Sequence, residues 1–327
     1  MRKRVFSGIQ PTGNIHIGNY LAAMKHWVAI QEDYDCVYCL VDLHAITVPQ
    51  DPHELKSKTR ELAGLLFSVG IDPDRSSVFV QSAIGAHAEL AWILNCFTPM
   101  GWMYRMTQFK EKSEKMKEKV SVGLFDYPAL MAADILLYDT HFVPVGEDQR
   151  QHVEFTRDLA QRFNSIYGET FVLPEALIPE TGARIMGLDD PTKKMSKSEN
   201  QSGHAINLLD APDEIRSKIM KATTDHLREI RFDEKRPGIY NLLTIYELFS
   251  GHQRAGIEAR FEGKGYADLK KELAEVVIEG LRPVQTRYAE ITADVHHLDA
   301  LLKKGTDRVR PIAERVLNTV KERVGLG

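Results

Sequence analysis

The sequence of 327 residues predicts an α/β fold in which a parallel sheet is followed by an all-helical region. Strand-like and helix-like segments alternate through the first two-thirds of the chain, and helices of ten or more residues between strands indicate crossover connections. After about Gly203, strand patterns become scarce and helical periodicity dominates. The composition, 43% hydrophobic and 27% charged, excludes collagen-like, disordered and disulfide-scaffold classes.

Short apolar runs bounded by turn residues predict the strands, and the first of them leads into a glycine-rich turn through Gly8 and Gly13. Helices are predicted where apolar residues recur with helical spacing between those runs. In the helix over 127–138, Pro128 is expected in the first turn, where proline is tolerated. In chain order we expect strand 4–7, helix 17–31, strand 37–41, helix 53–69, strand 77–81, helices 87–95 and 127–138, strand 141–145 and helix 147–167.

The C-terminal third predicts helices over 214–223, 239–250, 257–261 and 266–292, and a last helix from about Val309 to Val324. We therefore expect three regions: a sheet-containing domain over 1–205, a helical domain over 206–295, and a C-terminal helix within 296–327. No run of about 18 apolar residues occurs, so no membrane partner is expected.

The charge and cysteine content indicate the cellular location of the protein but do not identify a binding partner. The 42 basic and 46 acidic residues give a net charge of −4, which neither requires nor excludes a nucleic acid. Three cysteines in so long a chain favour a reduced, cytoplasmic location. Cys36 and Cys39 form a C-x-x-C, but a structural zinc site needs a second ligand pair and no cysteine follows Cys96. We interpret both as buried strand residues.

The first chemical motif runs from Gly8 to Asn19, where a strand, a glycine-containing turn and a helix start follow one another. Unpaired backbone N–H groups and the helix dipole favour an anion at such a helix start. His16 and Asn19 supply side-chain donors for phosphate oxygens, and Gly18 permits close backbone approach. Neither G-x-G-x-x-G nor a P-loop motif is present, which argues against a dinucleotide dehydrogenase and a P-loop enzyme.

The second motif is Lys194-Met195-Ser196-Lys197-Ser198, near the junction of the two halves. Two lysines three residues apart on a loop can close over a polyphosphate and offset charge on a leaving group. A lysine-rich loop taken alone is equally consistent with a solvated linker.

Two further segments combine polar groups with an apolar surround. Tyr127, Met131 and Asp134 share one face of the helix over 127–138, and a buried carboxylate there needs a partner. That partner is a ligand donor, a backbone N–H or an arginine. Over 143–149 a strand ends at a helix start, where Gly146 permits close approach and Gln149 can both donate and accept. Asp148 is read either as an acceptor for ribose hydroxyls or as a helix N-cap.

Two of these motifs together resemble the signatures of class I aminoacyl-tRNA synthetases: His16-Ile17-Gly18-Asn19 and Lys194–Ser198. The order of further segments is similar to that of bacterial tryptophanyl-tRNA synthetases over essentially the whole chain. Those segments are FSGIQPTG, HIGNY, DLHAIT, RMTQFKEKS, YPALMAADILLY, VPVGEDQ, and GARIM followed by KMSKS.

The resemblance implies a Rossmann-like catalytic domain, and it implies that L-tryptophan is activated with ATP and transferred to tRNA(Trp). Asp134 would accept the indole N–H, and Phe6 and Met131 would flank the ring. Tyr127, Gln149 and Gln10 would hold the amino-acid end. His44 is read either as a pocket residue or as a hydrogen-bonded core histidine. The implied ATP site comprises Gln10, Pro11, Thr12, Gly18, Asn19, Gly146, Glu147, Asp148, the backbone of Ile185, Lys194, Met195, Ser196, Lys197 and Ser198, with pyrophosphate on Lys112, Lys194 and Lys197.

Activation as implied needs no general base, because the carboxylate of tryptophan is already a nucleophile near neutral pH. The resemblance implies catalytic roles for His16, Asn19, Lys112, Lys194 and Lys197. Asn19 stands where the wider class usually has histidine, and we assign it an electrostatic role only, because it can donate to phosphate but cannot carry a proton. Mg²⁺ would accompany ATP without a dedicated protein cage, and no other metal site is expected. The C-terminal cysteines that hold an iron–sulfur cluster in some relatives are absent from this sequence.

The resemblance also implies a homodimer bridged by tRNA, with the helical domain meeting the anticodon and the last helix packing back on the catalytic domain. We expect no inserted editing domain. Three alternatives remain at this point: a tyrosine-specific relative, a nucleotidyltransferase that adenylylates a small molecule, and a synthetase-like RNA-binding or regulatory protein. The helical second domain and Lys194–Ser198 argue against the nucleotidyltransferase. The intact set of polar residues argues against the RNA-binding protein.

Overall fold

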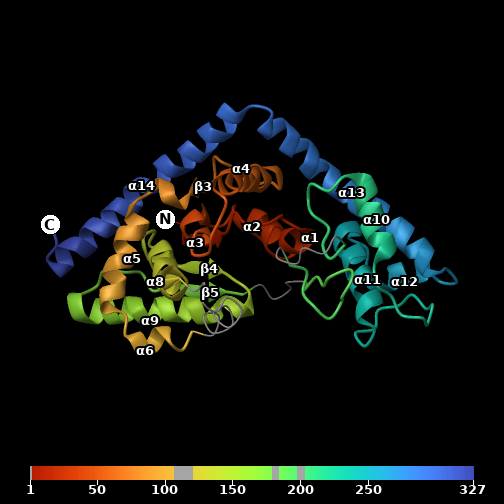
Figure 1. Ribbon diagram of the computed structural model, residues 1–327, viewed down its shortest axis with the longest axis horizontal. Helices are drawn as coiled ribbons and strands as arrows, with labels where there is room; N and C mark the ends of the chain where they lie inside the picture. Colours follow the sequence, from red (N-terminus) through yellow and green to blue (C-terminus); the bar gives the residue numbers. More distant parts are fainter. Residues whose placement is uncertain (1, 107–120, 179–183, 197–202) are drawn as a thin grey trace.

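The computed structural model describes residues 2–106, 121–178, 184–196 and 203–327. In Figure 1 a sheet-containing half and a helical half lie side by side, and a long C-terminal pair of helices spans both. The described strands form one five-stranded sheet in the order β3-β2-β1-β4-β5, and every strand pair is parallel. The predicted fold class is confirmed.

The strands are β1 (Arg4–Ile9), β2 (Asp35–Leu40), β3 (Ser77–Val80), β4 (Phe142–Pro144) and β5 (Glu175–Leu177). The sequence predicted the first four and missed β5, which has three partly exposed or exposed residues and no apolar run. From β1 the chain builds outward to β2 and β3, and it then returns to β4 and β5 on the other side of β1. The boundary between β1 and β4 is therefore a topological switch point, where open parallel sheets bind ligands.

Helices connect these strands as predicted, with two short additions. The predicted helix over 17–31 consists of α1 (Ile17–Asn19), a π-helical turn over 20–24 and α2 (Lys25–Ile30). The short helices α3 (Asp42–Ala45) and α6 (Met100–Met103) were not predicted. The longer helices of this half are α4 (Pro52–Ser68), α5 (Ala86–Phe97), α8 (Val122–Leu136) and α9 (Arg150–Tyr167).

The start of α8 differs from the prediction, and so does the place of Pro128 within it. Ser121 caps the helix by accepting a hydrogen bond from the backbone N–H of Leu124, and it also donates to the carbonyl oxygen of Thr47. The helix therefore begins five residues earlier than predicted, and Pro128 lies in its interior rather than in its first turn. The missing N–H of Pro128 removes one helical hydrogen bond. The cap and the burial of this segment hold the helix despite that loss.

The core divides between the two faces of the sheet because side chains alternate along each strand. Val5 and Tyr38 face the cluster that includes α4 and continues into the helical half. Phe6 and Phe79 face the cluster formed with α5, α8 and α9. Cys36 and Cys39 are both fully buried in β2, which confirms their interpretation as strand residues. Burial raises the pKa of the Cys36 thiol to about 11.

The helical half begins after residue 203 with α10 (Pro212–Lys221), α11 (Pro237–Ser250), α12 (Arg254–Arg260) and α13 (Tyr266–Thr292). The last helix, α14 (Val295–Val324), starts 14 residues before the predicted start at Val309. Gly305 and Pro311 weaken its helical pattern in the sequence, but Asp294 caps it at the N-terminus by accepting from His296 N–H.

Helix α14 lies along the outer strand β3 and also contacts α5. The close approach depends on Gly305, because a Cβ atom there would lie 2.0 Å from the carbonyl oxygen of Val78. Arg308 donates to the carbonyl oxygens of Asp74 and Ser76 next to that strand. A covered outer strand cannot pair with another chain. In the part of the chain that the structure describes, no helix is long and apolar enough to span a bilayer.

Candidate active site

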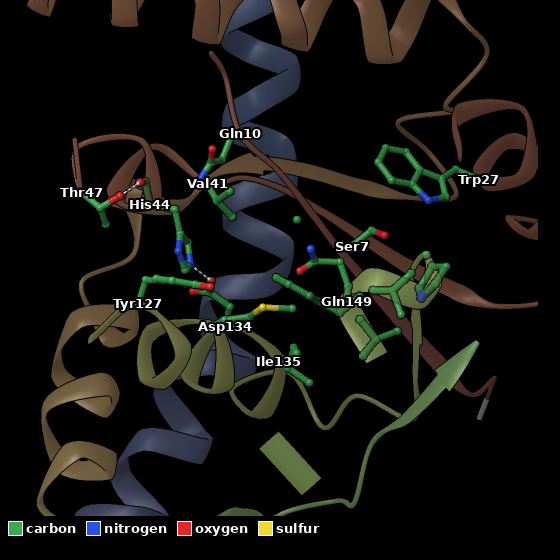
Figure 2. Close-up of a pocket in the computed structure, with 17 residues that line it drawn as sticks. Ser7, Gln10, Trp27, Val41, His44, Thr47, Tyr127, Asp134, Ile135 and Gln149 are labelled. Carbon is green, nitrogen blue, oxygen red and sulfur yellow. Dashed lines mark hydrogen bonds and ion pairs between the residues drawn. The ribbon is translucent and has the colours of Figure 1, made fainter. Parts of the chain in front are cut away.

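A cavity of about 370 Å³ lies at the carboxyl ends of β1 and β4, at the switch point of the sheet (Figure 2). Strand β1 and the turn after it supply one wall, and β4 with the following turn supplies the opposite wall. Helix α8 closes the base and α3 closes one side. The lining residues are Phe6, Ser7, Gly8, Gln10, Trp27, Val41, His44, Thr47, Tyr127, Met131, Asp134, Ile135, Val143, Pro144, Val145, Gly146 and Gln149.

All seven residues that were predicted to contact the amino acid line this one cavity. They are Phe6, Gln10, His44, Tyr127, Met131, Asp134 and Gln149. Residues 127, 131 and 134 reach it together because spacings of four, three and seven place them on one side of α8. Phe6 comes from the strand face opposite to Val5, so the pleat of β1 directs its ring to this side of the sheet.

Asp134 is 1% exposed, and three side chains hold its carboxylate. Its Oδ1 lies 2.6 Å from Gln81 Nε2 and 2.6 Å from His87 Nδ1. Its Oδ2 lies 2.8 Å from His44 Nε2, the contact drawn in Figure 2. The sequence left a backbone N–H or an arginine as possible protein partners, and both suggestions were wrong, because the partners are two histidines and a glutamine.

The charge state of Asp134 follows from competing effects. Burial disfavours the ionised carboxylate, whereas the charges and hydrogen bonds of His44 and His87 favour it. The balance holds the pKa of Asp134 below its usual value, so the group is ionised near neutral pH. His44 lines the cavity and is also a buried, hydrogen-bonded histidine, so the two alternatives predicted for it are both correct.

Tyr127, Gln149 and Gln10 supply further polar groups to the cavity lining. Tyr127 Oη lies 2.8 Å from Nε2 of the buried His152, and burial raises the pKa of the Tyr127 phenol to about 12. Gln149 donates from Nε2 to Asp148 Oδ2 at 3.0 Å. These groups can therefore offer donors and acceptors to a zwitterion at the mouth of the cavity.

The first motif forms a closed N-terminal cap on α1. His16 Nδ1 accepts from the backbone N–H of Asn19, and Asn19 Oδ1 accepts from the backbone N–H of His16. The imidazole proton must then lie on Nε2. Gly18 is required by this packing, since a Cβ atom there would lie 2.9 Å from His16 Nδ1.

The second motif belongs to a backbone hairpin. Met195 N–H donates to the carbonyl oxygen of Ile185, and Gly187 N–H donates to that of Lys193. Lys194 is exposed, whereas Met195 is 2% exposed and packs in the core. The side chain of Met195 therefore packs inside the protein and faces no ligand, although its backbone lies beside that of Ile185.

The helical half holds this hairpin at its base. Asn241 on α11 accepts from Met186 N–H and donates to the Met186 carbonyl oxygen, both at 2.9 Å. His204 is fully buried, with Nδ1 2.6 Å from Asp189 Oδ1 and Nε2 3.3 Å from the carbonyl oxygen of Lys194. The hairpin base is thus fixed, while Lys194 faces solvent.

The two motifs are neighbours in space. Ile17 N–H donates to the Ile206 carbonyl oxygen, and Leu208 N–H donates to that of Ile15, so segment 206–208 pairs with the first motif through an isolated antiparallel bridge. A Cβ atom at Gly18 would lie 3.6 Å from Cβ of Ile185. The structure thus brings the helix start of the first motif and the hairpin of the second to one side of the sheet.

The remaining predicted nucleotide-site residues lie at the rim or outside the described residues. Gly146, Glu147 and Asp148 are exposed at the end of β4, where Glu147 pairs with Arg150. The Asp148 carboxylate folds over Gly146, because a Cβ there would lie 2.7 Å from Asp148 Oδ1. Pro11 is buried, and Thr12 and Ser196 are partly buried. Lys112, Lys197 and Ser198 fall outside the described residues.

Sequence reasoning missed several residues of the site. Gln81 and His87, which hold Asp134, carry weak signals: Gln81 directly follows a parallel strand, and His87 interrupts an apolar helix. Trp27, from α2, lines the far end of the cavity and had no signal beyond its apolar spacing. Among the described residues there is no cluster of three or more His, Cys, Asp or Glu side chains that could hold a metal ion.

Several basic residues of the helical half form ion pairs, and in two of them, Lys218 and Arg236, the basic side chain is only 11% and 8% exposed. Arg236 is 8% exposed and binds Asp225, the Glu229 carbonyl oxygen and Tyr266. Its guanidinium holds the pKa of the Asp225 carboxyl well below the usual range. Lys218 pairs with Asp210. Lys221, Arg228, Arg231 and Lys235 are exposed.

Comparisons with known proteins give consistent matches over the whole chain. Residues 1–282 match the family described as tRNA synthetases class I (W and Y). A tryptophan–tRNA ligase of Wolinella succinogenes is 59% identical over 100% of this chain and 99% of its own length. That of Caldanaerobacter subterraneus is 60% identical over 99% of this chain and 98% of its own length. The crystal structure of tryptophanyl-tRNA synthetase from Campylobacter jejuni, complexed with ADP and tryptophan, superposes with a TM-score of 0.88 at 38% identity, covering 99% of this chain and 100% of that one.

Proposed function

The chain belongs to the class I tRNA synthetases of the tryptophan and tyrosine group, and we propose that it activates L-tryptophan with ATP and transfers it to tRNA(Trp). The reaction is that of a tryptophan–tRNA ligase, an ATP-dependent enzyme. The identity of about 60% to ligases of this specificity, over essentially the full length, supports tryptophan rather than tyrosine.

The observation that carries the choice of amino acid is the buried, ionised Asp134 at the base of an otherwise largely apolar cavity. In the proposed complex its carboxylate accepts the indole N–H, and Phe6 and Met131 pack against the ring. Tyr127, Gln149 and Gln10 then face the ammonium and carboxylate groups. Phenylalanine, which lacks a ring donor, would leave a buried acceptor unpaired and is rejected for that reason.

Activation joins a carboxylate oxygen of tryptophan to the α-phosphorus of ATP and breaks the bond to the bridging oxygen of pyrophosphate. The task of the protein is to place the two groups in line and to stabilise charge on the leaving group. The helix start at His16–Asn19 and the hairpin that carries Lys194 are the described groups suited to phosphate oxygens. Lys112 and Lys197 are proposed to assist, and Mg²⁺ would enter bound to the phosphates of ATP.

Transfer to tRNA is assigned to the same cavity mouth, with the anticodon read by the helical half. The exposed bases Lys221, Arg228, Lys235 and Arg231, the last paired with Glu229 at the surface, support that assignment. The buried or nearly buried ion pairs of Lys218 and Arg236 stabilise the fold instead. The proposed division remains 1–205 for catalysis, 206–295 for the anticodon and 296–327 for the helix that packs back.

A homodimer and a cytoplasmic location complete the proposal. Four large apolar side chains are exposed on or next to α5, α6 and α8: Trp92, Met100, Tyr104 and Val122. These helices are neighbours, because α8 contacts both α5 and α6. An exposed apolar patch of this kind is typical of an association surface. The described cysteines are unpaired thiols, consistent with a reducing compartment that also supplies ATP and tRNA.

The test is ATP–pyrophosphate exchange with each of the twenty amino acids, followed by charging of tRNA(Trp). Exchange with tryptophan alone supports the assignment. Exchange with tyrosine instead would keep the fold and the chemistry but overturn the proposed role of Asp134. No exchange with any amino acid, with and without tRNA, would overturn the proposal and favour an RNA-binding protein without aminoacylation.

A further inference from the structure

The carboxylate of Asp134 presents its two oxygens to different surroundings. Oδ1 accepts from Gln81 and His87, and neither of these residues lines the cavity. Oδ2 accepts from His44, which does line it. Oδ1 therefore lies on the buried side, with both lone pairs in use, and Oδ2 is the oxygen beside the cavity.

The orientation of each partner of Oδ1 is fixed by a second contact. Gln81 Oε1 accepts from the backbone N–H of Leu43 at 3.0 Å, so the amide nitrogen of Gln81 must face Asp134. His87 Nδ1 faces a carboxylate, which only accepts, so Nδ1 carries a proton and donates it to Asp134. Tyr138 Oη lies 2.7 Å from Nε2 of the same ring and forms its second hydrogen bond.

Tyr138 also connects this network to the apolar wall of the cavity. Its ring stacks on Phe6, with ring centroids 5.6 Å apart and planes at 9°. Both Tyr138 and His87 are fully buried. Tyr138 and His87 thus link the Asp134 carboxylate at the base of the cavity to the Phe6 ring in its wall. The Tyr138 hydroxyl and the His87 ring satisfy each other's hydrogen bonds without a water molecule.

We propose that His87 is a positioning residue for amino-acid selection, with Gln81 and Tyr138 acting through the same carboxylate. The three side chains hold Oδ1 so that Oδ2, already given one donor by His44, offers a single directed lone pair to the indole N–H. The proposal rests on the proposed role of Asp134 as the indole acceptor. It adds residues that touch no substrate and yet set how strongly the N–H is required.

The experiment compares tryptophan with β-(benzothiophen-3-yl)alanine, which has the same shape but carries sulfur in place of the N–H. The ratio of the two kcat/KM values in ATP–pyrophosphate exchange measures how strongly the N–H is read. We expect about a ten- to hundredfold preference for tryptophan in the unaltered protein, since the N–H bonds a charged acceptor. General damage to the fold would lower both kcat/KM values and leave their ratio unchanged.

Tyr138→Phe keeps the stacked ring and removes only the hydroxyl that is hydrogen-bonded to His87. We expect the ratio to fall about two- to tenfold. His87→Ala should lower the ratio further than Tyr138→Phe does. His87→Asn keeps an N–H near the position of Nδ1, so its ratio should lie between those of Tyr138→Phe and His87→Ala. Tyr38→Phe is the matched control, because its equally buried hydroxyl donates to the Trp27 carbonyl oxygen and not to this network. Its ratio should equal that of the unaltered protein.

An unchanged ratio in both Tyr138→Phe and His87→Ala would overturn the positioning role. A fall in the ratio for Tyr38→Phe equal to that for Tyr138→Phe would overturn it as well. Asp134→Asn distinguishes the two levels of the argument. If Asp134→Asn activates tryptophan with an unchanged ratio, the proposed role of Asp134 itself fails. If Asp134→Asn lowers the ratio while the His87 and Tyr138 variants do not, only the present inference fails.

Discussion

The cavity and the hairpin of the second motif are built in opposite ways. In the cavity, the key acceptor is 1% exposed and three side chains fix it. In the hairpin, backbone pairs and the anchors Asn241 and His204 fix the base, while Lys194 stands in solvent. Under the proposed function, this difference means that the group that selects the amino acid is preorganised, whereas the charge for the phosphates would be delivered from an exposed loop.

Removing the exposed charge should have the largest effect on the chemical step. We expect Lys194→Ala to lower kcat for ATP–pyrophosphate exchange on the order of 10²- to 10³-fold, because charge on the departing pyrophosphate is stabilised less. The KM for tryptophan should stay within about twofold. Lys193→Ala is the matched control, since Lys193 pairs with Asp190. A rise in the tryptophan KM as large as the fall in kcat would show that the two regions do not act separately.

Removing the buried charge of Asp134 should affect tryptophan rather than ATP. We expect Asp134→Asn to lower kcat/KM for tryptophan about 100-fold, because an amide N–H would face a donor from Gln81, His87 or His44. The KM for ATP should change little. Asp126→Asn on the same helix is the control, because the Asp126 carboxylate accepts from Asn95 and not from the partners of Asp134. Its kcat/KM for tryptophan should stay close to that of the unaltered protein. Steady-state exchange kinetics with each substrate varied in turn measure both effects.

The hairpin anchors should have a smaller effect and a different signature. His204→Ala removes the contacts to Asp189 and to the Lys194 carbonyl oxygen, so we expect the KM for ATP to rise about three- to tenfold. The tryptophan KM should be unaffected. His297→Ala, an exposed change on α14, provides the baseline. Equal shifts in both KM values would mean that His204 supports the fold as a whole rather than the hairpin.

The smallest effect concerns stability against acid. The pKa of Asp134 in the folded protein is held below its ordinary value of 3.8. A carboxyl group of this kind stabilises the fold above the unfolded-state pKa, and the contribution is lost as the pH falls through the folded-state pKa. The Tm of the unaltered protein should therefore fall more steeply below about pH 4 than that of Asp134→Asn. Parallel Tm curves from pH 7 to 3 would contradict this.

The same contrast explains what the sequence could predict. The fold class and four strands follow from apolar runs and helical spacing, and residues 127, 131 and 134 reach one cavity because helix geometry dictates it. Strand β5 could not be predicted, because a three-residue edge strand with exposed residues carries no pattern. The starts of α8 and α14 were predicted too late in the chain. Capping by Ser121 and Asp294 outweighs the prolines inside those two helices.

The partners of Asp134 could not be read from the sequence for a related reason. Gln81 and His87 lie 53 and 47 residues from Asp134 along the chain. They meet it because α5 packs against α8 and because Gln81 directly follows β3. The motifs of the nucleotide site were easier to recognise, since they are local strings. Their side chains are nevertheless partly committed to structure, as the cap of His16 and the buried Met195 show.

The central claim, that the tryptophan pocket is complete without the hairpin, is tested most directly by calorimetric titration of L-tryptophan into the protein in the absence of ATP. We predict binding by the unaltered protein, unchanged binding by Lys194→Ala, and at least about tenfold weaker binding by Asp134→Asn. Binding by Asp134→Asn as tight as that of the unaltered protein would contradict the claim, and so would loss of binding in Lys194→Ala.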